Sequence, residues 1–570
     1  MKKIMVFLLF ILSCLSSSFA EGNCRVQDEV PLRLMSAELK RGAKTFKKLN
    51  PSVYYLSYTY EEKHTINLQA EQGGLFSRPS IDTNLVVFAR AGSPRMDNTR
   101  PLKGDNNYNR NFTEIISGED PFDKHSAAFR LDLWRATQKI AETAQEEFSK
   151  VQTNSRTAAL RQDDSDDFVI PPASRYCRIE TLKTFDTEKI GRMLVKASKL
   201  VRGNSFVQES NFSFKVEQGH RYFADSVGSQ IKTPFIFVRL GYQLKNQLAD
   251  GAELARNNFY DVTDEDQLPS EEQFLADIRQ SLEELESLSK APEADPVSVP
   301  AILKNRAMGV FVHEVLGHRL EGHRQKQDSF GKTFTSKIGQ QVTAPFVSIV
   351  DDATMRSFKE QPLRGFYEYD DEGVKAVPVT LVQDGVLRGF LMSSSPIENF
   401  PVSNGHGRAS LGNVPVARMG NTRLIASKSV SYAELERQLL QEIRAQHKPY
   451  GYIIEDLSGG FTMTQTDFPQ VFKLTPNLVY RMYPDGRKEI VRGVDIVGTP
   501  LVSFGQILAA ADDDAVFNGS CGAESGWVPV SAISPSVLLK TLEVEKTAKS
   551  EKKPPILPSP YSLEKGGENK

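Results

Sequence analysis

The sequence predicts an α+β protein of two domains: a mixed N-terminal domain and a strand-rich C-terminal domain that carries a metal-binding helix. Three observations lead to this expectation. Strand-like and helical runs both occur in the first half, a Pro-rich segment at 290–300 interrupts the pattern, and strand-like runs dominate the second half after one His-rich helical stretch. The length of 570 residues is also more than one typical domain needs.

The N-terminal domain is predicted to span residues 21–289. Strand-like runs occur at 53–60 and 235–240. Residues 97–123 are polar and rich in turn-forming residues, so we expect a long surface loop there. Two apolar stripes at helical spacing predict core-facing helix surfaces, and their members are Phe129, Leu133, Ala136, Ile140, Ala144 and Phe148, and then Ile190, Met193, Ala197 and Val201.

A third helical stretch at 270–288 leads into a predicted linker at 290–300. The C-terminal domain is then expected at 301–545, with a strand-like run at 378–387. Residues 546–570 are rich in Lys and Pro, and we expect this tail to be disordered.

The first 20 residues have the pattern of a secretory signal peptide. Lys2 and Lys3 form a positive start, residues 4–12 are apolar, and residues 18–20 resemble a cleavage site. A rival interpretation is lipoprotein processing at Cys14, which the bulky Leu12 disfavours. No later stretch approaches the roughly 20 apolar residues that span a bilayer. We therefore expect an exported protein, periplasmic or secreted, with no membrane span.

Charge and cysteine content narrow the class of protein further. Lys and Arg number 70 against 72 Asp and Glu, a net charge of -2, so no basic surplus indicates nucleic-acid binding. After signal removal the chain keeps Cys24, Cys177 and Cys521. Cys24 and Cys177 could pair in an oxidising compartment if they lie close together, which would leave Cys521 for another role.

The segment from His313 to His318 carries the strongest functional signal, because it places two imidazoles on either side of Glu314. Imidazole is the commonest zinc ligand, and catalytic zinc takes three protein ligands and leaves a fourth position for water. Glu314 could accept a proton from that water. The alternative is an ordinary buried helix with one hydrogen-bonded and one exposed histidine.

The spacing of the two histidines requires a break in the helix. At 3.6 residues per turn, a separation of five residues turns the side chains about 140° apart. Gly317 tolerates backbone angles that other residues avoid, so we expect the helix to end or bulge there and to return His318 toward His313.

The third ligand has two candidates in the sequence. His323 follows in a stretch that loosely resembles the third histidine of metzincins, but its register does not fit that pattern. Cys521 lies in a glycine-rich segment, and a thiolate is a good zinc ligand. Cys521 could instead be a small buried apolar residue or a nucleophile paired with a histidine, although Glu314 between two histidines favours a metal.

The chain resembles the TldD/PmbA metallopeptidases, a family also known as modulators of DNA gyrase. The segment around His313 is similar to the metal helix of that family, with three residues between Glu314 and His318. Further similar segments follow in the expected order, and the resemblance covers residues 300–545 well and residues 21–290 weakly. The similar segments are 310–322, 350–354, 369–373, 378–387, 405–408, 496–500 and 519–522.

The resemblance implies a zinc ion held by His313, His318 and Cys521, with Glu314 as general base. It demotes His323, which stands where better-known members carry an acidic residue. It also implies unfolded polypeptide or peptide substrates and a homodimer, or a heterodimer with a paralogous subunit. The gyrase label does not imply DNA binding here, and the cytoplasmic setting of better-known members differs from the exported one expected above.

Two other polar segments are weaker candidates. His406 and Arg408 lie in a Gly-rich segment and are possible substrate or oxyanion donors, or part of a solvated turn. Asp370, Asp371 and Glu372 precede Gly373 and indicate a turn rather than a second metal site.

The sequence thus predicts a zinc-dependent peptidase that acts through a metal-activated water. One alternative is a non-catalytic assembly or peptide-binding subunit, in which His323 completes a closed structural zinc site. Another is a zinc amidase on non-protein substrates, because specificity resides in pockets that the sequence does not define.

Overall fold

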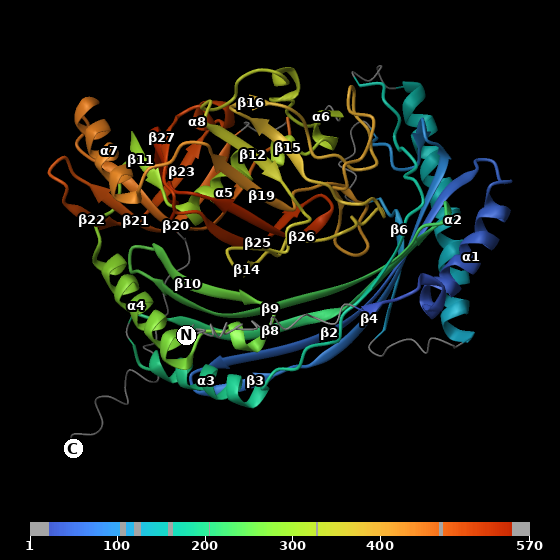
Figure 1. Cartoon of the computed structure of the whole chain (residues 1–570), viewed down its shortest axis with the longest axis horizontal. Coiled ribbons are helices and arrows are strands. Elements are labelled where there is room, and N and C mark those ends of the chain that lie inside the picture. The colour runs from blue at the N-terminus through green and yellow to red at the C-terminus, as the bar shows by residue number, and fades with distance from the viewer. Residues whose placement is uncertain are drawn as a thin grey trace, which may run out of the picture.

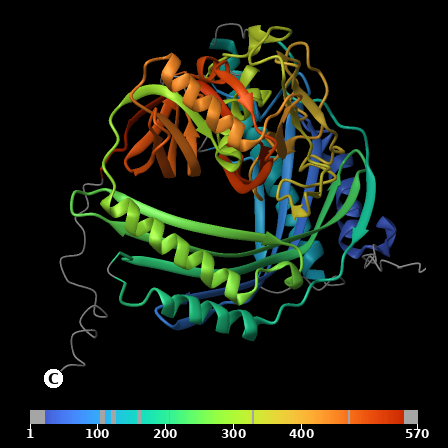
Figure 2. The same ribbon diagram turned by 60° about the vertical axis from the view of Figure 1, so that its left-hand side comes forward.

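A long curved sheet from the first half of the chain faces a strand-rich second half in the computed structural model (Figure 1). The structure describes residues 22–102, 110–118, 127–157, 163–204, 206–326, 329–466 and 471–549. The concave side of the sheet turns toward the strand-rich half (Figure 2). Helices and strands are both abundant and most strand pairs are antiparallel, which confirms the predicted α+β class.

The curved sheet has ten strands in the order β1-β7-β9-β8-β2-β4-β5, with β10 on β9, β3 on β2 and β6 on β4. Its central strands are 17 to 19 residues long, and side chains in β8 alternate between buried and more exposed positions as a period of two requires. The bounds are β1 Gly22–Asn23, β2 Val53–Glu71, β3 Gly74–Ser77, β4 Ser80–Ser93, β5 Met96–Asp97, β6 Thr113–Gly118, β7 Arg175–Ile179, β8 Glu209–Asp225, β9 Gln230–Gln247 and β10 Glu253–Val262.

Helices bury apolar stripes against this sheet. One core joins α1 and α2 to β2 and β4, and a second joins α3 and α4 to β8 and β9. Every residue of the two predicted stripes is buried, so both stripes are confirmed as core faces. The bounds are η1 Val26–Asp28, α1 Val30–Phe46, α2 Ala127–Thr157, α3 Thr187–Leu200, η2 Glu265–Gln267 and α4 Glu271–Lys290.

The start of the described chain is tied to this sheet. Cys24 and Cys177 form a disulfide, with their Cα atoms 5.4 Å apart. Cys177 lies in β7, and Cys24 directly follows β1, which pairs with β7. The pairing that the sequence left open is therefore present, and Cys521 is the free cysteine of the described chain.

The second half contains two larger sheets and two short strand pairs. One sheet has the order β11-β20-β21-β23-β27-β24, with β22 on β21, and the other has the order β16-β15-β12-β19-β26-β25. The strands are β11 Val297–Leu303, β12 Val347–Asp351, β13 Ser357–Phe358, β14 Gln361–Pro362, β15 Val379–Gln383, β16 Val386–Leu387, β17 Gly407–Arg408, β18 Val416–Ala417, β19 Asn421–Ala426, β20 Gly451–Thr462, β21 Phe472–Met482, β22 Lys488–Val491, β23 Val494–Gly498, β24 Ile507–Ala510, β25 Ala515–Ala523, β26 Gly526–Ser534 and β27 Val537–Lys546.

One helix, α5 Asn305–Val315, lies between these two sheets and contacts β20, β25 and β26. Its apolar residues join the largest core of the second half. This position holds the helix on several sides. The remaining helices are η3 Gly317–Leu320, α6 His323–Lys326, η4 Thr335–Lys337, α7 Tyr432–Ala445 and α8 Pro500–Phe504.

Several predicted connections differ in detail from the structure. The segment predicted as a linker at 290–300 runs from the last residue of α4 into β11, and Ala291 and Ala294 within it are buried. The predicted loop at 97–123 contains β6, because residues 113–118 pair with β4; residues 103–109 and 119–123 lie outside the described residues. The expectation of a wholly disordered tail is wrong at its start, where Lys546 ends β27 and Lys549 pairs with Asp250 and Glu293.

The predicted signal peptide at 1–20 and residues 550–570 also lie outside the described residues. Within the described ranges, no helix is long and apolar enough to cross a membrane.

Candidate metal centre

His313 and Glu314 lie in the last turn of α5. The helix is packed closely along its length: a Cβ on Gly309 would lie 3.2 Å from the Cβ of Ala532 in β26. The His313 ring is buried, and its direction is fixed because the helix is embedded between the two sheets. His313 and Glu314 therefore stand on a rigid element rather than on a loop.

His318 returns toward His313 because the α-helix ends between them. Val315 is the last residue of α5, and the 3-10 turn η3 begins at Gly317. The two imidazole centroids are 5.0 Å apart and nearly perpendicular. The predicted break is present, but the predicted reason for Gly317 is wrong. Its φ is not positive; instead, a Cβ there would lie 2.0 Å from Sδ of Met419, so the position requires glycine for close packing.

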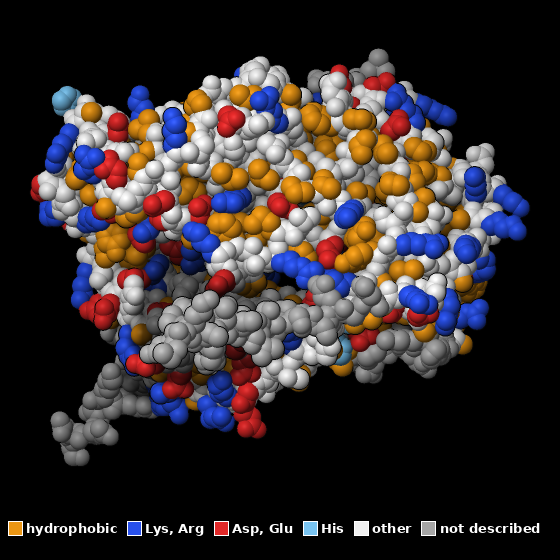
Figure 3. All heavy atoms as spheres, viewed as in Figure 1, with side chains coloured by type: hydrophobic (Ala, Val, Ile, Leu, Met, Phe, Trp, Pro, Cys, Tyr) orange, Lys and Arg blue, Asp and Glu red, His pale blue; other side chains and the backbone are white. Residues whose placement is uncertain are grey.

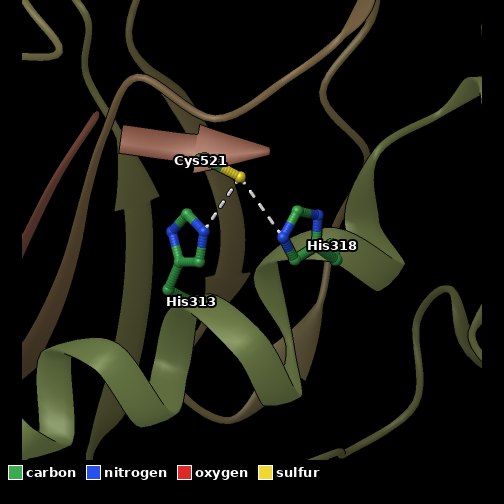
Figure 4. Close-up of side chains that lie close together, drawn as sticks. All are labelled: His313, His318 and Cys521. Atoms are coloured by element: carbon green, nitrogen blue, oxygen red, sulfur yellow. Dashed lines mark hydrogen bonds between the residues drawn. The ribbon is translucent and has the colours of Figure 1, made fainter. Parts of the chain in front are cut away.

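Cys521 projects from β25 toward both histidines (Figure 4). Its Sγ lies 3.2 Å from Nε2 of His313 and 3.3 Å from Nε2 of His318. The three atoms lie within 4.8 Å of one another, and all three residues are buried. Residues 208 positions apart in sequence are thus brought together by β25 and α5.

The charges of this trio favour the thiolate form of Cys521. Burial by itself would raise the pKa of the Cys521 thiol, but the charges of His318 and His313 outweigh burial and hold that pKa well below its ordinary value. Burial by itself would lower the pKa of His318. The negative charges of Cys521 and Glu321 outweigh burial and hold that pKa well above its ordinary value. Thiolate is the form of cysteine that binds metals.

A second layer of charged groups orients the trio. Nδ1 of His318 lies 3.2 Å from Oε2 of Glu321, a fully buried carboxylate. Arg324 donates to the same oxygen at 2.8 Å, and Arg418 Nη2 donates to the backbone oxygen of Cys521 at 2.7 Å. Burial alone would raise the pKa of Glu321, but His318, Arg324 and Arg418 lower it to about 2.

Sequence reasoning did not identify Glu321 or Arg418. Glu321 follows His318 by three residues, and this short separation is a signal that could have found a carboxylate partner for that histidine. Arg418 has no such signal, because it reaches Cys521 only through the packing of β18 and its following residues against the β25–β26 hairpin.

Glu314 faces the same site without being part of the trio. Its Oε2 lies 3.9 Å from Nε2 of His318. The backbone of β20 approaches it closely, because a Cβ on Gly460 would lie 3.3 Å from Cγ of Glu314 and 2.1 Å from Cδ2 of Leu474. The ladder between β20 and β21 shifts register before Gly460. A bulge next to the site therefore makes room for the glutamate.

The trio and Glu314 open onto a cleft of about 950 Å³ between the two halves of the molecule. The curved sheet contributes Arg239, Phe259 and Asp261, and the second half contributes α5, β20, β25 and β26. Lys and Arg are interspersed with Asp and Glu on the face in Figure 3. Residues of the curved sheet and of the second half therefore both line the candidate site, as is common for small-molecule and substrate sites.

The structure does not bring every predicted residue to this cleft. His323 pairs with Glu524 through Nε2 and is not in the trio. His406 is fully buried, with Nε2 3.3 Å from Oδ1 of Asp351, and Arg408 donates to the backbone oxygen of Met419. Neither is among the described residues that line the cleft, so the suggested oxyanion role for His406 and Arg408 is withdrawn.

The acidic segment at 370–372 forms a turn, as the sequence indicated. Oδ1 of Asp370 accepts hydrogen bonds from the backbone of Glu372 and Val374, and Gly373 has a φ of +77°. Burial raises the pKa of Asp370 well above its ordinary value and also raises that of Glu372. These carboxyls are not among the metal-binding clusters of the described residues.

The donor set fits zinc. Two imidazole nitrogens and one thiolate are typical zinc ligands, and at bond lengths of about 2.0 and 2.3 Å a tetrahedral ion would separate nitrogen and sulfur by about 3.5 Å. The observed separations of 3.2 and 3.3 Å are close to that value. The fold and site together define an α+β protein with a buried His-His-Cys trio at a cleft between the two halves of the chain.

Comparisons with known proteins place this class in a family. Residues 296–546 match the PmbA/TldA metallopeptidase C-terminal domain. A metalloprotease TldD homolog of Haemophilus influenzae is 26% identical over 396 residues, which are 66% of this chain and 76% of the relative. A metalloprotease of Archaeoglobus fulgidus is 31% identical over 251 residues, 44% of this chain and 53% of the relative. Residues 296–546 thus carry the C-terminal domain of the TldD/PmbA family.

Structural similarity extends beyond the matched domain. TldE from Thermococcus kodakarensis aligns with a TM-score of 0.59 and 14% identity, over 90% of this chain and all of that one. A zinc metalloprotease TldD homolog of Saccharolobus solfataricus is 26% identical over 43% of this chain and 51% of its own length. The overall fold is thus shared across both halves, whereas the sequence similarity to the archaeal relatives spans about half of their length.

Proposed function

We propose that this protein is a zinc-dependent peptidase that hydrolyses unfolded polypeptides or peptides. The observation that carries the proposal is the convergence of His313, His318 and Cys521 at a cleft, with Glu314 beside them. Three protein ligands leave a fourth position open, which distinguishes catalytic from structural zinc. Relatives named metalloproteases support the same class of reaction.

The trio would hold the zinc, and the other residues have separate tasks. The chemistry that zinc supplies at such a site is polarisation of the scissile carbonyl and a lowered pKa for the attacking water. Glu314 accepts the proton of that water and passes it to the leaving amine. Glu321 accepts the hydrogen bond of His318 Nδ1 and so leaves Nε2 free to bind a metal.

The closed, structural type of zinc site is less well supported. It requires a fourth protein ligand, and the sequence offers His323 for that role. His323 Nε2 is already engaged by Glu524, which also accepts from Arg324 at 2.9 Å. A zinc amidase on non-protein substrates would share the same ligands and is separated from a peptidase by its substrates alone.

We further propose that the protein is exported and that it assembles as a dimer, with itself or with a paralogous subunit. The signal-like pattern at 1–20 and the disulfide between Cys24 and Cys177 both support an oxidising compartment. The fold of a TldE protein and the sequence similarity to TldD homologs support a paralogous pair.

Metal content and hydrolysis of unfolded casein test the main proposal. The wild type is expected to bind one zinc and to cleave casein. Glu314→Gln should keep zinc and lose activity by about 10²–10⁴-fold, the usual contribution of a general base. Cys521→Ala should lose zinc. Retention of zinc by Cys521→Ala would refute the ligand set, and a zinc-loaded wild type that cleaves no peptide bond would refute the peptidase.

A further inference from the structure

Arg306 lies on the same face of α5 as the catalytic motif. Arg306, Val310, His313 and Glu314 all line the cleft, and their spacing is that of one face of an α-helix. His313 follows Arg306 by seven positions, which at 1.5 Å per residue is about 10 Å along the helix axis. Arg306 therefore lines the same cleft as the metal centre, but a different part of it.

Arg306 differs from the other arginines of this cleft in its partners. Arg239 makes a bidentate pair with Asp261 at 2.6 and 2.8 Å, and Arg324 is paired with Glu321 and Glu524. Among the described residues, no ion pair involves Arg306, and its buried Nε has no hydrogen-bond partner. Asp456 also lines the cleft, but it forms no ion pair with Arg306.

The position of Arg306 does not stabilise the helix either. It lies in the first turn of α5, where the partial positive charge of the helix dipole disfavours a cation. A buried nitrogen without a hydrogen-bond acceptor is also unfavourable. A carboxylate that entered the cleft would remove both disadvantages, and the planar guanidinium matches a carboxylate with two hydrogen bonds.

We propose that Arg306 is a specificity-determining residue that binds a carboxylate of the substrate. This inference rests on the proposed peptidase function and names its substrate class. An extended peptide advances about 3.3 Å per residue, so the distance of about 10 Å corresponds to a carboxylate about three residues from the cleaved bond. The carboxylate belongs either to an Asp or Glu side chain or to the free C-terminus of a short peptide.

The test compares matched peptides on the full zinc-loaded chain. Quenched fluorescent peptides carry Glu or Gln at the second, third or fourth position on either side of the cleaved bond, each with a free or an amidated C-terminus. The wild type is expected to prefer one Glu peptide, or one free C-terminus, by about tenfold in kcat/KM, mainly through KM. The two arms of the peptide set distinguish the side chain from the C-terminus.

Arg306→Gln should bring that ratio of kcat/KM close to one, and Arg306→Glu should reverse it in favour of a Lys peptide. Arg192→Gln is the matched control, because Arg192 is 71% exposed on α3 and does not line the cleft. A preference that survives in Arg306→Gln, or a wild type without any preference, overturns the inference. Reversal by Arg306→Glu cannot arise from misfolding.

Binding separates this inference from the proposed function. If the wild type cleaves none of the peptides, fluorescence anisotropy measures their affinity for Glu314→Gln with and without Arg306→Gln. If Arg306→Gln abolishes the preference for a Glu peptide or for a free C-terminus, carboxylate recognition is supported even though the peptidase proposal fails. Equal affinities for all peptides in both variants overturn the inference as well.

Discussion

His318 and His406 occupy contrasting environments within the same half of the molecule. Each is buried and each has a carboxylate partner, Glu321 at 3.2 Å and Asp351 at 3.3 Å. His318 uses its second nitrogen to approach Cys521, whereas the second nitrogen of His406 contacts Asn404. A buried His–carboxylate pair is therefore not sufficient for a metal site. The second nitrogen must also meet other donors at an open cleft.

Breaking the buried pair of Asp351 and His406 should have the largest effect, which is a loss of free energy of unfolding. Asp351→Asn removes the charge beside His406 and also weakens the hydrogen bonds that Thr422 and Gly420 donate to this side chain. Removal of one partner from a buried pair costs about 3–5 kcal/mol. Urea denaturation should show this loss, whereas the folded fraction should retain zinc. Loss of zinc without loss of stability would contradict the contrast between His406, which has a structural role, and His318, which faces the cleft.

Gly317→Ala should disrupt the open site through sterics. Its Cβ would meet Sδ of Met419 at 2.0 Å, so either Met419 or the turn that carries His318 must move. A displacement of about 1 Å can reduce activity about 100-fold. Measurement of zinc content and casein hydrolysis tests this prediction. Gly389→Ala is the control, because a Cβ there would lie 3.5 Å from Phe400, an ordinary contact. Equal activity of both variants would show that Met419 adapts.

Glu321→Gln should weaken zinc binding about 10–100-fold, the usual effect of removing a carboxylate that orients a histidine ligand. A competition assay with a chelator measures this affinity. His323→Asn is the matched comparison, since His323 lies five residues from His318 but contacts Glu524. The affinity of His323→Asn should stay within about threefold of the wild type; a larger loss in that variant would restore His323 as a ligand.

The smallest expected effect concerns pH, and it has opposite signs at two carboxyl sites. Burial alone would raise the pKa of Asp351, but His406 and Thr422 lower it, so this group adds stability that is lost as pH falls below about 4. Burial raises the pKa of Glu372, so its contribution is complete below about 4.5 and is lost as pH rises through its raised value.

Glu372→Gln should therefore reduce the loss of stability as pH rises, and Asp351→Asn should reduce the loss as pH falls. Thermal denaturation between pH 3 and 8 measures both. A pH profile unchanged in Glu372→Gln would contradict a raised pKa at that position.

Periodic patterns in the sequence predicted much of the fold. The stripes from Phe129 and from Ile190 predicted buried helix faces because helical spacing is a local property, and the structure buries both. The strand within the loop predicted at 97–123 was missed, because β6 is fixed by pairing with β4 rather than by its own pattern.

The sequence by itself determined the resemblance to the TldD/PmbA metallopeptidases, the His313 motif and the need for a helix break before His318. The need for the break depends only on the spacing of the two histidines and on the helical period. The structure places Cys521 beside the two histidines, as the resemblance implied. Only the tertiary structure decided that Gly317 is required by Met419 and that His406 is closed off from the cleft. These outcomes depend on contacts between residues far apart in sequence, which local patterns do not specify.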